Sequence, residues 1–347
     1  MKFIFTADTH FGCKFINENA DLRNRQLVMD FGRIADYADK SGIKYILLGG
    51  DMFDTPYPDE NVKAAVYRVF ESHSDIRFMA VCGNHDPLSM TDFYNNPPEN
   101  LFVFPDSITK ADMQDISVYG ISLSDAFEAP DPWSGFCSDG KFITLSHGTL
   151  SGKGGFSLDP SSLAQTGAAL SLLGHIHKTQ SVFLPNGTRA LYAGTPFGHG
   201  FDECGQKGFY VIDTDDFSYT YVNTDSKIYR EYTADISSCS SIAQVMDILF
   251  KIKPQENEIA RAVLVGKLKQ PFDIDCDVLT EYIKESFIQI KDETTIDTDI
   301  FKSAGENTLE GKFVDILLHR LENAQQSERQ QILDAIKEGV LAIRSSK

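Results

Sequence analysis

The feature of this sequence that most limits its possible folds is a series of short apolar runs that end in glycine and polar residues. Each run is four to six residues long and rich in Ile, Val, Leu or Phe, and the runs lie at 2–6, 44–48, 77–82, 141–146 and 170–173. This is the pattern of buried strands. Amphipathic, helix-like segments at about 23–40 and 60–72 separate the first three runs. Because parallel strands need helical crossovers, the alternation predicts a layered α/β unit.

Further strand candidates lie closer together in the sequence, at 117–121, 189–193, 208–213 and 218–223. Short connections favour antiparallel or mixed pairing, since parallel neighbours need long crossovers. We therefore expect an α/β sandwich of four layers, with two central β-sheets flanked by helices, over residues 1–228.

The pattern changes after this first domain. Helical segments and strand-like runs alternate at 241–252, 261–268, 276–285 and 286–291, which predicts a small α/β cap domain over 229–304. Two further helices, at about 308–322 and 328–344, predict a C-terminal helical hairpin over 305–347. In the second of these helices the apolar residues Ile332, Ile336 and Val340 share one face.

The charge of the chain bears on its substrate. It carries 32 Lys and Arg against 50 Asp and Glu, a net charge of −18. Affinity for nucleic acid comes mostly from cations that neutralise phosphates, so this balance argues against strong autonomous binding. A polyanionic substrate would need bound cations or a partner to supply positive charge.

The cysteines and the hydropathy bear on location. The six cysteines are far apart and form no C-x-x-C pair, which is typical of reduced thiols in the cytoplasm. The apolar run at the N-terminus is too brief for a secretion signal, and no apolar stretch approaches ~18 residues. We therefore expect a cytoplasmic protein that does not span a membrane.

The polar residues that follow the apolar runs are types that bind metals. The first run ends in Asp8 and His10, and the later ones end in Asp51 and Asp54, in Asn84 and His85, in His147, and in His175 and His177. Five of the eight histidines lie in these clusters. Because ligands bind beyond the carboxyl ends of strands in α/β sheets, we expect the clusters to converge on one crevice.

The types of residue limit the chemistry of this crevice. Carboxylate, amide oxygen and imidazole together suit Mn, Fe, Zn, Co or Mg, and the absence of cysteine argues against a structural zinc site. One carboxylate can bridge two divalent cations, and two cations about 3.5–4 Å apart bind a phosphoryl group and acidify a water molecule. A protonated histidine can then supply the proton that the leaving group needs. The sequence therefore predicts hydrolysis of phosphate esters.

The motifs D-x-H, G-D-x-x-D, G-N-H-D, His-Gly and G-H-x-H, in this order, resemble those of the calcineurin-like metallophosphoesterases. The resemblance implies that one cation is held by Asp8, His10 and His177, and the other by Asn84, His147 and His175. It also implies that Asp51 bridges the two cations. His85 would be the general acid, and the Asp54 side chain would orient His85 by a hydrogen bond.

A closer resemblance, over about residues 1–225, is to the SbcD-type DNA-repair exonucleases. It rests on the segments ADTHFG, GGDMFDT, GNHD, LLGHIH and YAGTPFGHGFDECGQKGFYVID. The resemblance implies a Mn²⁺-dependent exonuclease or endonuclease acting on DNA. It also implies an SbcC-type coiled-coil ATPase as partner, bound through the C-terminal helices at 308–344, and a homodimer is a further assembly to test.

Two other functions stay open. The charge of −18 also suits a phosphatase or phosphodiesterase acting on a small, nucleotide-like molecule. A non-catalytic scaffold could use the metals for folding alone. Of the remaining histidines, we expect His73, His199 and His319 to be ordinary core or surface residues.

Overall fold

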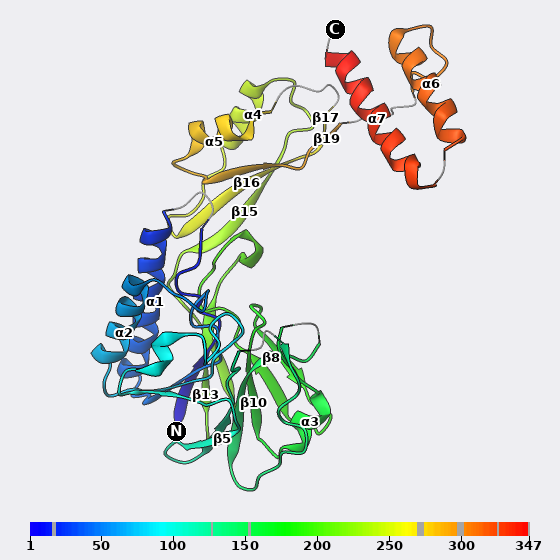
Figure 1. Ribbon diagram of the computed structural model, residues 1–347. Helices are drawn as coiled ribbons and strands as arrows, with labels where there is room; N and C mark the ends of the chain where they lie inside the picture. The colour runs from blue at the N-terminus through cyan, green and yellow to red at the C-terminus, as the bar shows by residue number, and fades with distance from the viewer. Residues whose placement is uncertain are drawn as a thin grey trace. The chain divides into compact units, whose positions relative to one another are not determined.

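The computed structural model describes residues 1–15, 19–125, 128–151, 154–268, 274–296, 302–324 and 326–345. The chain divides into two compact units, Met1–Tyr229 and Arg230–Lys347 (Figure 1). Among the described residues, no helix is both long enough and apolar enough to cross a membrane.

The first unit contains a six-stranded sheet in the order β14-β13-β1-β2-β3-β4. The four strands that precede residue 104 pair in parallel, whereas β13 and β14 are antiparallel additions at one edge. The strands are β1 (Lys2–Thr6), β2 (Tyr45–Leu48), β3 (Arg77–Ala80), β4 (Leu101–Val103), β13 (Gly208–Asp213) and β14 (Tyr219–Asn223). Helices α1 (Ala20–Lys40) and α2 (Glu60–Ser72) make the crossovers between the first three strands, which confirms the predicted β-α-β-α-β start.

A second sheet has the main order β11-β12-β10-β8-β6-β5, with parallel pairing inside and antiparallel strands at both ends. Its strands are β5 (Thr109–Asp112), β6 (Ser117–Gly120), β8 (Phe142–Thr149), β10 (Leu170–Gly174), β11 (Gln180–Phe183) and β12 (Arg189–Tyr192). The short strands β7 (Glu128–Ala129) and β9 (Gly155–Ser157) extend it beside β8. The predicted mixed pairing is confirmed for this sheet. The two candidates at 208–213 and 218–223, however, are β13 and β14 of the first sheet.

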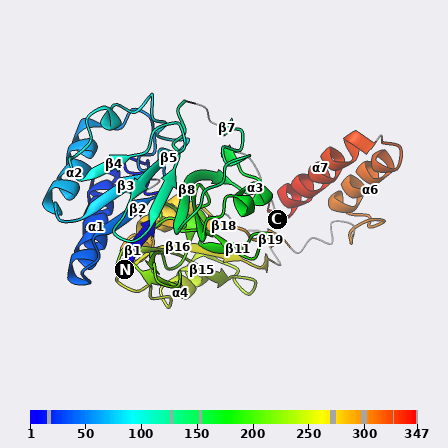
Figure 2. The same cartoon turned by 90° about the horizontal axis from the view of Figure 1, so that it is seen from below.

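Alternating side chains of β1 explain how the layers are held together. Phe3 and Phe5 point into a core shared with the second sheet, where they join residues such as Leu145 of β8 and Leu172 of β10. Ile4, between them, joins the core that α1 and α2 cover. A third core lies under α3 (Pro160–Gln165), on the other side of the second sheet. The layers are therefore helices, sheet, sheet and helix, as expected for the predicted sandwich (Figure 2).

The second unit contains a small sheet in the order β15-β16-β18, with its own apolar core. Its elements are β15 (Ile228–Asp235), α4 (Ile242–Leu249), β16 (Glu258–Val265), β17 (Lys267–Leu268), α5 (Cys276–Ile283), β18 (Gln289–Asp292) and β19 (Thr295–Ile296).

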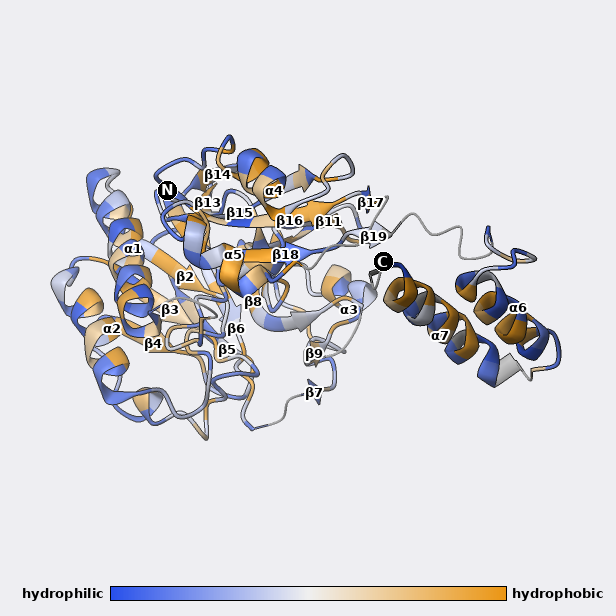
Figure 3. Cartoon of the chain, turned by 90° about the horizontal axis from the view of Figure 1, so that it is seen from above, coloured by the Kyte–Doolittle hydropathy of each residue, from blue (hydrophilic) through white to orange (hydrophobic). Residues whose placement is uncertain are grey.

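Helices α6 (Leu309–Glu322) and α7 (Gln326–Ser345) follow. They pack against each other through the buried residues Val314, Leu321, Ile332, Ile336 and Val340, and apolar and polar residues alternate along each helix (Figure 3). The face predicted from the apolar spacing of α7 is thus the face that contacts α6.

Candidate metal centre

All nine residues singled out from the sequence lie in one connected cluster at the carboxyl ends of the central strands. Loops after β1, β2, β3 and β10 carry eight of them, and His147 lies within β8, paired with Gly174 of β10. Direct contacts join the loops, because His10 Nε2 lies 3.0 Å from His177 Nε2 and Asn84 Oδ1 lies 3.0 Å from His147 Nε2.

The main chain of this cluster adopts unusual angles. Asp8, His10, Asp51 and His175 have φ values of 55°, 45°, 50° and 94°, which few residues other than glycine adopt. Among the described non-glycine residues, Phe217 alone shares a positive φ with them. Such angles gather at sites where the surrounding structure imposes them, and here they turn successive side chains toward a common centre.

Two glycines allow close approach at the same place. A Cβ atom on Gly83 would lie 2.1 Å from Asp51 Oδ1, and one on Gly50 would lie 2.5 Å from His147 Nδ1. Real Cβ atoms do not come so close to their neighbours, so the space beside these two ligand candidates requires glycine.

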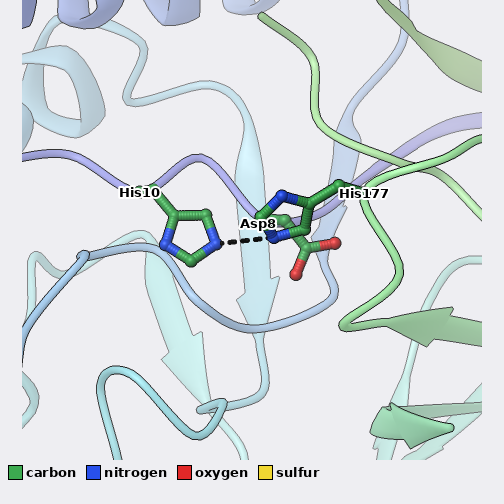
Figure 4. A group of neighbouring side chains, drawn as sticks. All are labelled: Asp8, His10 and His177. Carbon is green, nitrogen blue, oxygen red and sulfur yellow. Dashed lines mark hydrogen bonds between the residues drawn. The ribbon is translucent and has the colours of Figure 1, made fainter. Parts of the chain in front are cut away.

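The first group of ligand candidates is Asp8, His10 and His177, whose donor atoms lie within 4.8 Å of one another (Figure 4). Asp8 is fully buried. Its Oδ1 accepts a hydrogen bond from the His175 main chain at 2.9 Å, while its Oδ2 has no hydrogen-bond partner among the described residues. A buried carboxylate oxygen without a partner is costly, and a cation would satisfy it.

The second group is Asp51, His147 and His175, with Asn84 between the two histidines. Asn84 Oδ1 lies 3.0 Å from His175 Nδ1 as well as from His147 Nε2. Asp51 Oδ2 is 3.2 Å from His147 Nε2 and 3.8 Å from His10 Nε2. Asp51 therefore faces both groups.

Hydrogen bonds on the far side of three imidazole rings fix which nitrogen faces the centre. The Nδ1 atoms of His10, His147 and His177 contact Asp54 Oδ1 at 3.2 Å, the Gly49 carbonyl at 2.9 Å and the Glu203 carboxylate. These partners accept hydrogen bonds, so each Nδ1 donates and each Nε2 faces the centre, where it can bind a cation once it has lost any proton it carries. Together with the unpartnered Asp8 oxygen, this set of nitrogen and oxygen donors fits divalent cations.

The charges of the cluster shift the pKa values of its histidines. Burial acts to lower the pKa of His10, but the hydrogen bond to Asp54 and the charges of Asp51 and Asp8 raise it to about 9. Burial also acts to lower the pKa of His147, but the interactions with Asp51 and Asp8 outweigh it and raise this pKa to about 9. At neutral pH the metal-free centre therefore holds protons that a cation has to displace.

The contact between Asp54 and His85 differs from the one expected. His85 Nδ1 lies 3.0 Å from the main-chain carbonyl oxygen of Asp54, whereas the nearer Asp54 carboxylate oxygen is 3.7 Å away. That carboxylate binds His10 Nδ1 instead. Asp54 thus orients His85 with its main chain and His10 with its side chain. The side chain of His85 itself is 43% exposed, which leaves it open to a bound molecule.

Asp86 is a buried residue of the G-N-H-D motif to which the sequence analysis gave no role. Its carboxylate accepts main-chain hydrogen bonds from Met52 at 2.7 Å, Phe53 at 3.1 Å and Gly83 at 2.9 Å, and another from the Tyr94 hydroxyl. It therefore ties the loop after β2 to the loop after β3. The motif itself contained the signal, since Asp86 is a third polar residue that directly follows the site residues Asn84 and His85.

His199, which was expected to be an ordinary core or surface residue, lies beside the cluster. Its ring centroid lies 5.6 Å from that of His10, and its Nδ1 lies 3.1 Å from Glu203 Oε2. Glu203, which also contacts His177, was absent from the sequence-derived site. Both residues lie in a glycine-rich loop after β12, whose place beside the centre depends on the tertiary fold. His73 and His319 lie outside the cluster.

Comparison of the sequence with known families and proteins agrees with these observations. The sequence profile of the calcineurin-like phosphoesterases matches residues 1–179. The DNA double-strand break repair protein Mre11 of Sulfolobus acidocaldarius is 24% identical over 306 residues, covering 80% of this chain and 78% of that protein. Its namesake from Sulfurisphaera tokodaii is 27% identical over 128 residues, covering 35% and 33%. Among solved structures, TT1561 of Thermus thermophilus matches with a TM-score of 0.41 at 15% identity, covering 64% of this chain and 98% of that one.

Proposed function

The chain belongs to the calcineurin-like phosphoesterase family, and from this membership we propose that it is a binuclear phosphodiesterase that hydrolyses DNA with Mn²⁺. Membership makes it a metal-dependent phosphoesterase. The number and identity of the cations, the roles of single residues and the DNA substrate belong to the proposal.

The observation that carries the proposal is the position of Asp51 between two groups of donors. Asp8, His10 and His177 would hold one cation, Asn84, His147 and His175 would hold the other, and Asp51 would bridge them. A pair of divalent cations polarises a phosphoryl group and lowers the pKa of a bound water to roughly 7.

His85 is the group of this chain that we assign to the leaving oxygen. Its main-chain N–H donates to Asp51 Oδ1 at 2.8 Å, which fixes the residue beside the bridging carboxylate. Its Nδ1 faces the Asp54 carbonyl, an acceptor, and therefore carries hydrogen. The remaining nitrogen, Nε2, is then the one that can deliver a proton.

A cavity whose lining has one cation in excess, here named the basic cavity, supports an anionic substrate. A cavity of about 660 Å³ lies between the starts of α1 and α2, and its lining carries three cations, Lys14, Arg25 and Arg68, against two carboxylates, Asp21 and Asp59. Within the described ranges, none of these three cations is paired with a carboxylate. In a chain with 18 excess negative charges, such cations offer contacts to the phosphates of an extended substrate. The names of the two Mre11 relatives, which are DNA repair proteins, point to the same substrate.

The experiment that tests the proposal compares two substrates. Purified full-length chain with Mn²⁺ is incubated with labelled single- and double-stranded DNA, and separately with bis(p-nitrophenyl) phosphate. We expect both to be hydrolysed. Turnover of the aryl diester with intact DNA, even when a coiled-coil ATPase partner is present, would exclude the DNA substrate and favour a small nucleotide-like one.

For partners we propose an SbcC-like ATPase bound through α6 and α7. Leu309 and Ile316 of α6 are 73% and 70% exposed, although both are apolar. Loss of co-purification in a Leu309→Glu, Ile316→Glu double variant, with the exposed Lys312→Glu as control, would support this partner. A homodimer is tested by light scattering, and we place the protein in the cytoplasm, in keeping with its six free cysteines.

A further inference from the structure

Glu203 is a buried carboxylate that touches the centre from a loop far along the chain. It ends a short 3-10 helix, Phe201–Glu203, and is 8% exposed. One carboxylate oxygen, Oε1, accepts a hydrogen bond from His177 Nδ1. The other, Oε2, accepts bonds from the main-chain N–H of His199 at 3.0 Å and from its Nδ1 at 3.1 Å.

His199 continues this connection to the loop after β1. Its Nε2 lies 3.0 Å from the carbonyl oxygen of Thr9, the residue between Asp8 and His10. The hydroxyl of Thr9 donates in turn to the carbonyl oxygen of Met52, at 3.0 Å, directly after Asp51. One continuous set of close polar contacts thus runs from His177 through Glu203 and His199 to the loops that carry Asp8, His10 and Asp51.

We propose that Glu203, together with His199, is a positioning residue that fixes His177 and the loop after β1 for the cation held by Asp8, His10 and His177. The carboxylate requires His177 Nδ1 to donate, so that Nε2 presents its lone pair to the centre. The side chain of His177 is 39% exposed and has space to turn. Packing holds the fully buried His147 in place. The more exposed His177 depends instead on its hydrogen bond to Glu203.

The proposed role is confined to one cation. In the second group, His147 is held by the Gly49 carbonyl, and Asn84 contacts His175, whereas the bonds of Glu203 lead to His177 and His199. Loss of Glu203 should lower the affinity for the first cation and leave the affinity for the second nearly unchanged. General damage to the fold would lower the affinity for both cations.

The test rests on the proposed binuclear centre and measures metal binding separately from activity. Full-length wild type, Glu203→Ala, Glu203→Gln and His199→Ala are titrated with Co²⁺ against a competing chelator, and the visible spectrum of bound Co²⁺ is recorded. Glu258→Ala is the matched control, because Glu258 is also a buried carboxylate, paired with Arg230 in the other unit. Circular dichroism of each protein reports its fold.

We expect wild type to bind two Co²⁺ ions. In Glu203→Ala the affinity for one of them should fall about 10–100-fold, as for other lost partners of ligating histidines, with a changed spectrum. Glu203→Gln, which keeps the shape and one acceptor oxygen, should lose less, and Glu258→Ala should bind as wild type does.

Unchanged affinity and spectrum in folded Glu203 variants would overturn this inference alone, as would an equal loss of both ions. Wild type that binds no Co²⁺ would overturn the proposed function with it. If Glu203→Ala fails to fold, Glu203→Gln and His199→Ala decide the question by the same two measurements.

Discussion

Asp51 and His85 are joined by a hydrogen bond of 2.8 Å, from the main-chain N–H of His85 to Asp51 Oδ1. The residue proposed to bridge two cations therefore also holds the residue proposed to donate the proton. The two proposed roles are separable, because one depends on the side chain of Asp51 and the other on the ring of His85.

Replacing Asp51 by alanine should remove metal and activity together. Its Oδ2 faces both donor groups, so both cations lose a ligand. Elemental analysis after dialysis, beside the rate with an aryl phosphodiester, measures the two effects. Unchanged metal content in Asp51→Ala would refute the bridging role.

Replacing His85 by alanine should keep the metals and lower turnover by about 10²–10⁴-fold, the usual contribution of a positioned acid. His73→Ala is the control, since His73 is bonded to Asp36 away from the centre. A rate in His85→Ala within a factor of about two of wild type would exclude the proton-donor role and bring the scaffold hypothesis forward.

Gly83→Ala should damage the centre through a single methyl group. The added Cβ would lie 2.1 Å from Asp51 Oδ1, so the carboxylate has to move. We expect metal affinity and turnover to fall while the circular dichroism spectrum stays native. Gly32→Ala is the matched control, because its Cβ meets nothing within 4 Å in helix α1; it should gain about 1 kcal/mol of stability and keep full activity.

Arg25→Ala and Arg68→Ala should distinguish a polymer from a small substrate. Both residues line the basic cavity, so DNA hydrolysis should fall several-fold at low salt, and the difference from wild type should shrink at higher salt, where screening already weakens these contacts. Hydrolysis of bis(p-nitrophenyl) phosphate should not change. Arg33→Ala, in the same helix as Arg25 but outside that cavity and paired with Asp30, serves as control. Equal effects on both substrates would contradict a role in DNA contact.

Metal binding should release protons. Because the pKa values of His10 and His147 are about 9 without metal, both rings are protonated at neutral pH and must lose a proton to bind a cation. Apparent affinity should therefore fall as the pH falls below about 9, by up to roughly tenfold per pH unit for each displaced proton. Calorimetry in two buffers of different ionisation enthalpy counts these protons, and a count near zero at about pH 7 would contradict the expectation.

The strands and the clusters at their ends could be predicted because each is local in the sequence. A short apolar run marks β1, and Asp8 and His10 follow it within four residues. Glu203 could not be found in this way, since 26 positions separate it from His177. Its approach depends on how the loop after β12 folds back. The carboxylate of Asp54 is a subtler case, because sequence spacing does not decide whether a side chain or its carbonyl reaches His85.

In the second unit, the elements were predicted better than their limits. The strand expected at 286–291 is β18, Gln289–Asp292, and the helix expected at 241–252 is α4, Ile242–Leu249. Short elements end where tertiary hydrogen bonds end, and these are not visible in hydropathy.

The positive φ angles of Asp8, His10, Asp51 and His175 affect the stability of the protein and the substitutions that it can accept. Each costs on the order of 1–3 kcal/mol, so without bound cations these four residues lower the free energy of unfolding. Cations bound to these side chains would offset this cost. Loss of the cations would therefore lower stability as well as activity. Glycine at any of the four positions would relax the main chain but would remove a proposed metal ligand. Selection for stability and selection for activity therefore favour different residues at these positions.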